Sequence, residues 1–335
     1  MAEIDSGDWD NLLARYPDAH ILQSTAWGQL KADFGWKVTH VLLPDCGGQL
    51  LIKEVLPGIR FAYLPKGPVG IDCHLLWPEI DLVCHRLNCV FLKVEPDTWM
   101  SDDHKNDLRN EPIPSTFILS KHSIQPMRTL IIDIKGEEAQ ILGRMKQKTR
   151  YNINLAGKKN VIVEPYTDLS AFYHLMEITG QRDQFGYHSL AYYQRAYDLF
   201  HAQDCCQLLV AKYENKPVAA LIVFKFGKRA WYFYGASSNK DRDKMPNYLL
   251  QWEAIRWARL QGCTEYDLWG VPDEDLSTLE ANFSQNSTGL WGVYRFKRGF
   301  GGELMRSAGP WDRIYKPSLY RIYSLWLKYR KVEGY

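Results

Sequence analysis

Cationic side chains are concentrated in one stretch of this sequence. Lys and Arg side chains in such a cluster can contact the phosphates of a nucleic acid. Segment 144–159 carries six of them around the aromatic Tyr151, namely Arg144, Lys146, Lys148, Arg150, Lys158 and Lys159. Such a run can neutralise backbone phosphates whatever the base sequence. A solvated basic helix face explains the same pattern, and at this point both interpretations stay open.

Other common catalytic centres have no motif here. The nine histidines are scattered without HExxH or a His–Cys cluster, so we expect no metal site. No GxSxG motif marks a serine nucleophile of the α/β-hydrolase kind. The seven cysteines are odd in number and lack CxxC spacing, which predicts free thiols in a reducing compartment and no disulfide framework.

The clearest structural pattern is a three-stranded antiparallel meander followed by a helix and a strand. Alternating apolar residues and turn residues predict the meander over 206–237, the helix over 246–262 and the strand over 264–270. Upstream of the meander, a strand at 127–134 and a helix over 136–159 are expected. The aromatic and basic tail at 311–331 is expected to be helical.

This order resembles the core of GNAT acyltransferases, in which a glycine-rich loop before the helix presents backbone N–H groups to the pyrophosphate of coenzyme A. The equivalent residues here, 242–247, contain no glycine, and Pro246 lacks an N–H group. We therefore expect an acyl donor other than coenzyme A.

Four stretches resemble the FemABX family of aminoacyl-tRNA-dependent peptidyltransferases, which build peptidoglycan cross-bridges. They are QSTAWGQLKADFGWK at 23–37, RMKQKTRYNINLAGKKNV at 144–161, YFYGASS at 232–238 with the segment 246–270, and YRFKRGFGGELMRSAGPWDRIYKP at 294–317. The resemblance implies an α/β (α+β) fold of two GNAT-like domains with mixed, mainly antiparallel sheets. It assigns 1–130 with 312–335 to a precursor-binding domain and 131–311 to the tRNA side and the catalytic lysine. No heptads predict a coiled-coil arm, so the compact form is expected.

The family reaction moves an amino acid from the 3′-ester of a tRNA to a side-chain amine of the third stem-peptide residue in a cell-wall precursor. For this chain the resemblance implies Ala, Ser or Gly as the amino acid, a UDP-linked or lipid-linked muramyl peptide as acceptor, and no cofactor. Two alternatives stay open: a GNAT-like N-acyltransferase with another acyl donor, and a protein that binds RNA or precursor without turnover.

The resemblance also implies site residues. Lys297 and Phe296 match the family's F-K-x-G-F-G-G motif and are the expected catalytic pair, because a fixed cation stabilises the oxyanion formed in ester aminolysis. Lys31, Arg182 and Tyr187 are expected at the precursor phosphates. For each cation the simpler interpretation is a surface residue that keeps its charge in water.

Two further groups complete the expected site. Glu95 and Asp97, at a strand end, together with Tyr248 are expected at the acceptor amine, which must lose a proton before it attacks. An ordinary strand-end loop is the alternative for the two carboxylates. The tRNA is expected to contact Lys146, Lys148 and Arg150.

Composition limits the remaining classes. A chain of 335 residues favours two domains, and 46% hydrophobic residues exclude a wholly disordered protein. A net charge of +2 argues against a histone-like nucleic-acid binder. The acidic N-terminus is unlike a secretory signal, and the longest apolar run, 218–224, is too short to span a bilayer. We expect a cytoplasmic protein, and a pI near 8.0 with the basic tail permits contact with the inner membrane face.

Overall fold

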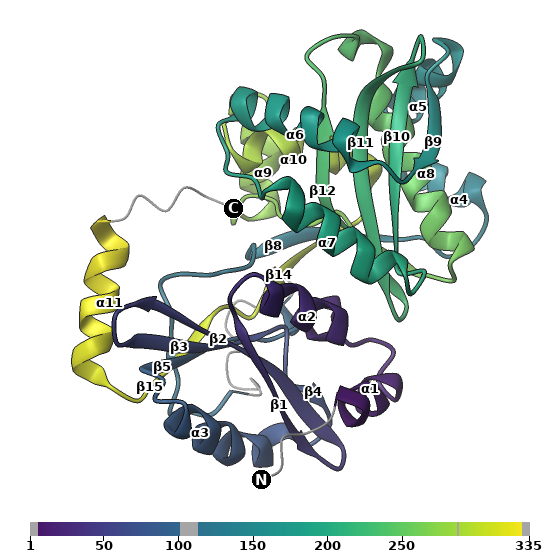
Figure 1. The fold of residues 1–335 in the computed structure, drawn as a ribbon. Helices are drawn as coiled ribbons and strands as arrows, with labels where there is room; N and C mark the ends of the chain where they lie inside the picture. Colours follow the sequence, from purple (N-terminus) through teal and green to yellow (C-terminus); the bar gives the residue numbers. More distant parts are fainter. Residues whose placement is uncertain (1–5, 101–112, 287, 330–335) are drawn as a thin grey trace. The chain divides into compact units, whose positions relative to one another are not determined.

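A computed structural model describes residues 6–100, 113–286 and 288–329, which form two compact units (Figure 1). The described residues up to 127 and from 306 onward make the first unit, and residues 128–305 make the second. The chain therefore crosses between units at 127–128 and 305–306, whereas the sequence analysis placed the crossings at 130–131 and 311–312. At the first crossing a strand of the second unit already begins at Arg128, and the second crossing falls within the strand Glu303–Ser307.

The first unit is a mixed sheet with helices on both faces. Its helices are α1 (Ser6–Ala14), α2 (Thr25–Asp33), α3 (Leu76–Arg86) and α11 (Pro317–Tyr329). Its strands are β1 (Lys37–Leu43), β2 (Cys46–Leu56), β3 (Ile59–Pro65), β4 (Val69–Gly70), β5 (Phe91–Glu95), β6 (Trp99–Met100), β7 (Ile118–Leu119) and β15 (Trp311–Ile314). The main sheet has the order β1-β2-β3-β5-β15-β7, with β4 beside β2. Only β3 and β5 run parallel among these pairs.

Alternation along the strands sends side chains to opposite faces of this sheet. On one face, Leu50 and Leu92 belong to a core shared with Ile80 of α3. On the other face, the ring of Phe91 lies 4.8 Å from that of Tyr323 in α11, so α11 covers the face opposite α3.

A buried ion pair joins the strands of the first unit to α11. Lys93 of β5 and Asp312 of β15 are 2.8 Å apart, with both side chains 2% exposed. The Lys93 ammonium also donates to Ser120 Oγ at 2.6 Å and to His122 O at 2.8 Å. Tyr320 Oη of α11 donates to Asp312 Oδ2 at 2.7 Å, so α11 contacts the anion of the pair directly.

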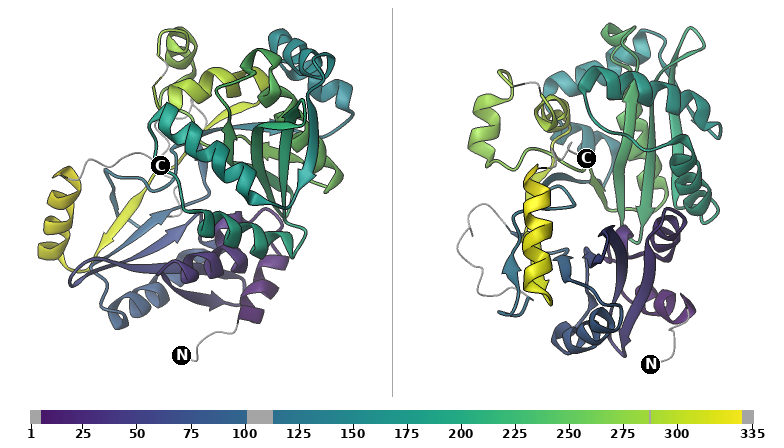
Figure 2. Two further views of the ribbon diagram at one scale, coloured as in Figure 1. Left: turned by 45° about the horizontal axis from the view of Figure 1, so that its top comes forward. Right: turned by 60° about the vertical axis from the view of Figure 1, so that its left-hand side comes forward.

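The second unit is a longer mixed sheet (Figure 2). Its helices are α4 (Glu138–Arg144), α5 (Gln147–Lys158), α6 (Leu169–Asp183), α7 (Leu190–His201), α8 (Pro246–Leu260), α9 (Leu276–Asn282) and α10 (Leu290–Lys297). Its strands are β8 (Arg128–Asp133), β9 (Ile162–Tyr166), β10 (Cys206–Tyr213), β11 (Lys216–Phe226), β12 (Arg229–Ser237), β13 (Glu265–Asp267) and β14 (Glu303–Ser307). The sheet has the order β6-β14-β8-β13-β12-β11-β10-β9, in which β6 pairs with Arg306 and Ser307 of β14. The predicted meander, the helix after it and the following strand are confirmed as β10 to β12, α8 and β13.

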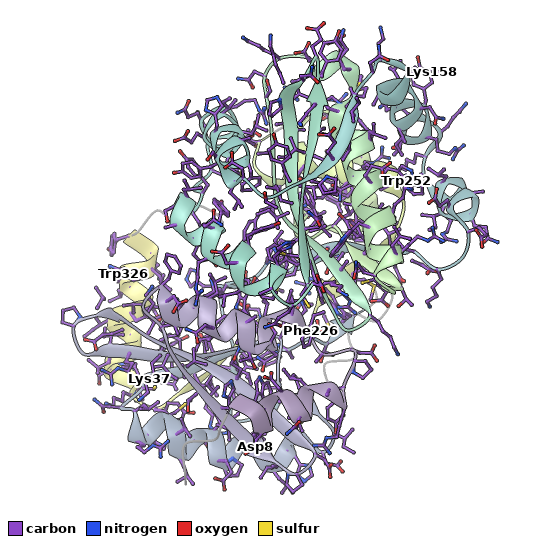
Figure 3. All side chains as sticks on the ribbon, turned by 45° about the vertical axis from the view of Figure 1, so that its right-hand side comes forward. Asp8, Lys37, Lys158, Phe226, Trp252 and Trp326 are labelled. Carbon is purple, nitrogen blue, oxygen red and sulfur yellow. A yellow bond between two sulfur atoms is a disulfide. The ribbon has the colours of Figure 1, made fainter. Side chains whose placement is uncertain are left out.

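Helices cover both faces of this sheet as well. Leu221 and Val223 of β11 share a core with Ile255 of α8, and Figure 3 shows the side chains between the sheet and the helix that carries Trp252. On the opposite face, Phe224 meets Phe200 of α7 with ring centroids 5.2 Å apart. The described helices include none that is both long and apolar enough to cross a bilayer.

Three expectations about local structure are wrong. The helix expected over 136–159 is broken at Met145 and Lys146, both extended, because the Lys146 N–H donates to Gly299 O at 2.9 Å instead of continuing the helix. The tail begins as strand β15, which pairs with β5, before Pro317 starts α11. Cys46 and Cys73 form a disulfide between β2 and the turn before α3, where free thiols were expected.

Replacing Lys93 by Met is expected to destabilise the protein by about 3–5 kcal/mol, because the buried Asp312 carboxylate loses its cation. The double variant Lys93→Met/Asp312→Asn should recover part of this loss, since the uncompensated charge is then gone. Urea unfolding measures both. Arg60→Met, which breaks the exposed pair with Glu54, is the control and should cost less than about 1 kcal/mol. A Lys93→Met protein as stable as the wild type would contradict the assignment.

Candidate functional site

The centre of the second unit is the place where two parallel strands stop pairing. β12 and β13 pair from Arg229↔Glu265 to Trp231↔Asp267, and β13 then ends while β12 continues to Ser237. The register between β11 and β12 shifts just beyond this point, which marks a bulge. The carbonyl groups that follow β13 therefore have no strand partner on β12 and are available to another donor.

That donor is Lys297, the expected catalytic lysine. It is the last residue of α10, and its ammonium donates to Gly270 O at 2.8 Å and to Trp269 O at 3.2 Å. The residue is 6% exposed, and its ammonium lies 5.8 Å from the ring centroid of Tyr232 on β12. Burial lowers the pKa of Lys297 to about 7, and the Asp267 carboxylate opposes this shift. The alternative of a strand lysine with its charge in water is therefore wrong.

The glycines after Lys297 are required by close packing. Gly302 has φ +97°, and a Cβ there would lie 2.8 Å from Ile131 O of β8. Gly299 is also crowded, since a Cβ there would lie within 3 Å of the hydroxyl of Thr149 on α5. These contacts hold the end of α10 close to the sheet and so fix the position of Lys297 relative to the strands.

Two other predicted residues lie beside Lys297. The ring of Phe296 meets that of Tyr248 at 5.0 Å, edge to face, and that of Phe300 at 5.0 Å. Tyr248 lies in the first turn of α8, where the sequence analysis expected it at the acceptor site. The structure thus brings Phe296 and Tyr248 into contact, and Phe296 precedes Lys297 directly in the chain.

A carboxylate anchors α9 to α10 next to this centre. Glu280 accepts from Arg298 Nε at 2.7 Å, from Tyr294 Oη at 2.9 Å and from Lys146 Nζ at 3.3 Å. The adjacent Arg298 guanidinium is the main reason that the pKa of Glu280 falls to about 2.

The three residues expected to contact tRNA differ in their surroundings. Lys146 is engaged with Glu280, and Arg150 donates to the carbonyl of Met145 at the break between α4 and α5. Lys148 is exposed, as is the ring of Tyr151. The basic run is therefore partly used to secure the helix break, although Arg144, Lys146, Lys148, Lys158 and Lys159 all keep exposed surface.

Arg182 and Tyr187 both lie near the C-terminal end of α6. Arg182 donates to Ser237 O at 3.0 Å, to Asn239 Oδ1 at 3.1 Å and through two nitrogens to Asp183. Tyr187 lies against Gly180, where a Cβ would clash with its ring. The guanidinium is thus held at the end of β12 in a fixed orientation.

In the first unit Lys31 has a neighbour that the sequence analysis missed. The Lys31 ammonium lies 4.6 Å from the Trp27 ring centroid, and that of Lys53 lies 5.1 Å from the Trp36 ring centroid. Trp36 N–H donates to Lys31 O at 3.0 Å, so the two stacked pairs adjoin. Burial and, second, the charge of Lys53 lower the pKa of Lys31 to about 8. The signal in the sequence was the alternation of β2, which turns Lys53 away from the core side of Leu50 and Ile52.

The two carboxylates near the end of β5 are placed differently. Glu95 is buried and accepts from Tyr63 Oη at 2.6 Å and from the backbone N–H groups of Ile124 and Gln125. Burial raises its pKa, and these hydrogen bonds oppose the rise. Asp97 is half-buried in the loop before β6. Glu95 therefore ties the chain at 124–125 to the sheet, and Asp97 is the more accessible of the two.

The sequence analysis also missed Asp267, the last residue of β13. Asp267 is fully buried, and its Oδ1 accepts from Trp269 N–H at 2.7 Å and from the hydroxyl of Thr129 on β8. An acidic residue between the apolar Tyr266 and Leu268 was the available signal. The described residues contain no group of three or more His, Cys, Asp or Glu side chains arranged to hold a metal ion.

Solved structures with the same architecture define the class. A crystal structure of FemX matches 95% of this chain and 98% of its own, with a TM-score of 0.82 at 22% identity. A tandem GNAT protein from the clavulanic acid biosynthesis pathway matches 92% of this chain and 96% of its own, with a TM-score of 0.50 at 9% identity. The fold is therefore a mixed α/β fold of GNAT-like architecture, which confirms the predicted fold class.

Sequence comparison gives the family. The model of the FemAB family matches residues 115–216 and 201–328, so the chain belongs to the FemAB family. The lipid II:glycine glycyltransferase of Staphylococcus haemolyticus (strain JCSC1435) is 26% identical over 95% of this chain and 94% of that protein. The protein of the same name from Staphylococcus aureus is 24% identical with the same coverage. The resemblance found in the sequence is confirmed, and the protein is an aminoacyltransferase of the peptidoglycan cross-bridge class.

Glu280→Gln is expected to lower the free energy of unfolding at pH 7 by roughly 1 kcal/mol after solvent screening, because Arg298 and Lys146 lose their anion. The melting temperature should fall accordingly. Since the folded pKa of about 2 lies below the ordinary value of 4.5, this stability is present above pH 4.5 and disappears as pH falls through 2. Thermal denaturation followed by circular dichroism at pH 7 and pH 3 measures the difference. Glu177→Gln, on the surface of α6, is the control. A difference that grows toward pH 3 would contradict the assignment.

Proposed function

We propose that this protein transfers an amino acid from aminoacyl-tRNA to the side-chain amine of the third stem-peptide residue of a peptidoglycan precursor. The observation that carries the proposal is the buried Lys297 ammonium, held by two carbonyls where β12 and β13 part. Relatives named for lipid II and glycine favour a lipid-linked acceptor and glycine as the amino acid. Ala and Ser remain alternatives for the assay, as does a UDP-linked acceptor.

The reaction needs a stabilised oxyanion. The acceptor amine attacks the carbonyl carbon of the aminoacyl ester, and the carbonyl oxygen becomes negatively charged. The tetrahedral intermediate then collapses, the bond to the tRNA 3′-oxygen breaks, and that oxygen takes up the proton released by the amine. A preorganised cation in a site with little water stabilises the oxyanion strongly. Lys297 supplies that cation, and Phe296, Phe300 and Tyr248 limit the access of water around it.

The amine must be neutral when it attacks. Asp97 is our candidate for orienting the acceptor ammonium and accepting its proton, because it is half-buried on a short loop after β5. Glu95 supports this loop region through its hydrogen bonds to 124–125 instead of meeting the substrate. Tyr248 is proposed to line the acceptor position beside Phe296.

The precursor phosphates need cations. In the first unit we assign this role to Lys31 and add Lys53, since two adjacent stacked lysines repel each other until an anion is bound. In the second unit we assign it to Arg182, whose guanidinium would exchange its bidentate Asp183 partner for phosphate oxygens, with Tyr187 in the segment after α6. Of the proposed tRNA contacts, Lys146 and Lys148 are exposed and Arg150 is half-buried.

The structure gives little support to a coenzyme A donor. Residues 242–244 form a short 3-10 turn, Met245 has φ +58°, and Pro246 is the first residue of α8. A glycine loop with free N–H groups is thus replaced by a proline-started helix, which removes a donor from the pyrophosphate position.

A lipid-linked acceptor would require contact with a membrane, and α11 has a suitable surface. Ile322, Leu325 and Tyr329 are exposed at 52%, 53% and 86%, and their spacing places them on one stripe of the helix. Arg321 and Lys328 are also exposed, and α11 contains no acidic residue. We propose that this stripe docks on an anionic membrane at its cytoplasmic face.

Lys297→Met is expected to reduce transfer at least 100-fold, because the oxyanion loses its cation. The assay mixes the protein with tRNA charged with radiolabelled Gly, Ala or Ser and with a UDP-linked or lipid-linked muramyl pentapeptide. Lys216→Met, an exposed lysine at the start of β11, is the control and should retain activity. Wild-type protein that transfers none of the three amino acids to either acceptor would refute the proposed reaction. Active Lys297→Met protein would refute the role of the lysine.

Ile322→Asp/Leu325→Asp is expected to abolish binding to vesicles that contain phosphatidylglycerol, because it places two anions on the apolar stripe. Vesicle sedimentation with phosphatidylglycerol and with phosphatidylcholine alone measures this, and the wild type should bind the anionic vesicles more tightly. Leu276→Asp, an exposed position on α9, is the control. Equal binding of wild type and double variant would rule out docking through α11.

A further inference from the structure

Asp267 is a buried carboxylate that the proposed mechanism does not yet use. It lies at the end of β13 with no exposed surface, at the last pair that β13 makes with β12. The next residues form the turn whose carbonyls hold Lys297. A buried carboxylate at such a place needs both hydrogen-bond donors and a cation.

The donors come from the turn and from the neighbouring strand. Trp269 N–H donates to Asp267 Oδ1 at 2.7 Å, and the hydroxyl of Thr129 on β8 donates to the same oxygen. Trp269 has φ +60°, a left-handed conformation that is unfavourable for a large side chain. Its ring packs edge to face against Phe233 at 4.7 Å. The carboxylate thus closes a tight turn that presents the carbonyls of Trp269 and Gly270 to Lys297.

The other ionisable groups around Lys297 are engaged elsewhere. Glu280 of α9 is paired with Arg298 and Lys146, and Asp273 is paired with Arg128 of β8 at 3.1 Å. Tyr232 of β12 faces the ammonium as a neutral phenol, because burial raises its pKa to about 12. Tyr248 of α8 contacts Phe296 and Phe300. Asp267 is then the carboxylate in the described part of the chain that can compensate the buried charge of Lys297.

We propose that Asp267 is the positioning residue for Lys297: it fixes the left-handed turn at Trp269 and supplies the negative charge that keeps the buried amine an ammonium. This inference rests on the proposed role of Lys297 in transfer. It adds a physical requirement, because without the carboxylate burial would favour the neutral amine, and a neutral amine stabilises an oxyanion poorly.

The direct test is the titration of Lys297 in ¹³C-lysine-labelled full-length protein, with the resonance assigned by Lys297→Arg. Asp267→Asn keeps an oxygen that can accept from Trp269 N–H but removes the charge. We expect the pKa of Lys297 to fall from about 7 by about one unit or more. Asp273→Asn is the control, because it removes the charge of a carboxylate already paired with Arg128. It should leave the pKa of Lys297 unchanged. An unchanged Lys297 titration in folded Asp267→Asn protein overturns the proposal.

The pH profile of transfer gives a second readout that a purely structural role would not move. The alkaline limb of kcat should shift to lower pH in Asp267→Asn by the same amount as the Lys297 titration, and Asp267→Glu should restore part of the shift. A fall in kcat that is uniform across pH overturns the proposal. Because the titration needs no turnover, failure of the proposed transfer reaction would be visible separately as absent activity in the wild type.

A reciprocal measurement covers the case in which Asp267→Asn does not fold. Coupling between two titrating groups is mutual. In Lys297→Met, the ¹³C carboxyl resonance of Asp267 should therefore titrate at higher pH than in the wild type, by about the shift predicted for Lys297. An Asp267 carboxyl whose titration is insensitive to Lys297→Met overturns the proposal.

Discussion

The burial of positive charge is the constraint on which both units depend. A lysine ammonium taken out of water is destabilising unless carbonyls, carboxylates or both replace its hydration. In the first unit this requirement is met at Lys93, whose carboxylate and carbonyl partners come from separate segments of the chain. In the second unit it is met at Lys297, by carbonyls that the sheet leaves unpaired. The first arrangement stabilises the fold, whereas the second leaves a cation only partly compensated and able to respond to a developing anion.

The early end of the pairing between β12 and β13 explains why the Lys297 ammonium can be buried here. A continuous sheet would use every carbonyl in ladder hydrogen bonds and would have none for an ammonium. The early end of β13, the bulge between β11 and β12, and the turn at Trp269 together free two carbonyls near the middle of the unit. The glycines after α10 then allow the chain to pass close to β8 and α5. Lys297, at the end of α10, can therefore reach the two carbonyls.

Much of this could be predicted from the sequence, because the relevant patterns are local. The meander, α8 and the F-K-x-G-F-G-G segment follow from alternation, turn residues and spacing within short windows. The break between α4 and α5 could not be predicted, because its cause is Gly299, far away in the chain. β15 was missed for the same reason, since only pairing with β5 makes that aromatic segment a strand. Lys53 and Asp267 were missed because each depends on which face of a strand meets a distant residue.

The order of the strands has a consequence for how the chain folds during synthesis. The second unit is an insertion between β7 and β15 of the first, and β15 lies between β5 and β7 in the sheet. Residues 6–119 therefore leave the ribosome with the edge of β5 unpaired, and the face later covered by α11 stays open. The strands β8 to β13 of the second unit are continuous in sequence and precede β15, and only β14 of that sheet is made as late as β15. The nascent first unit must consequently wait for nearly the whole chain, so it is the part for which chaperone protection during translation matters most.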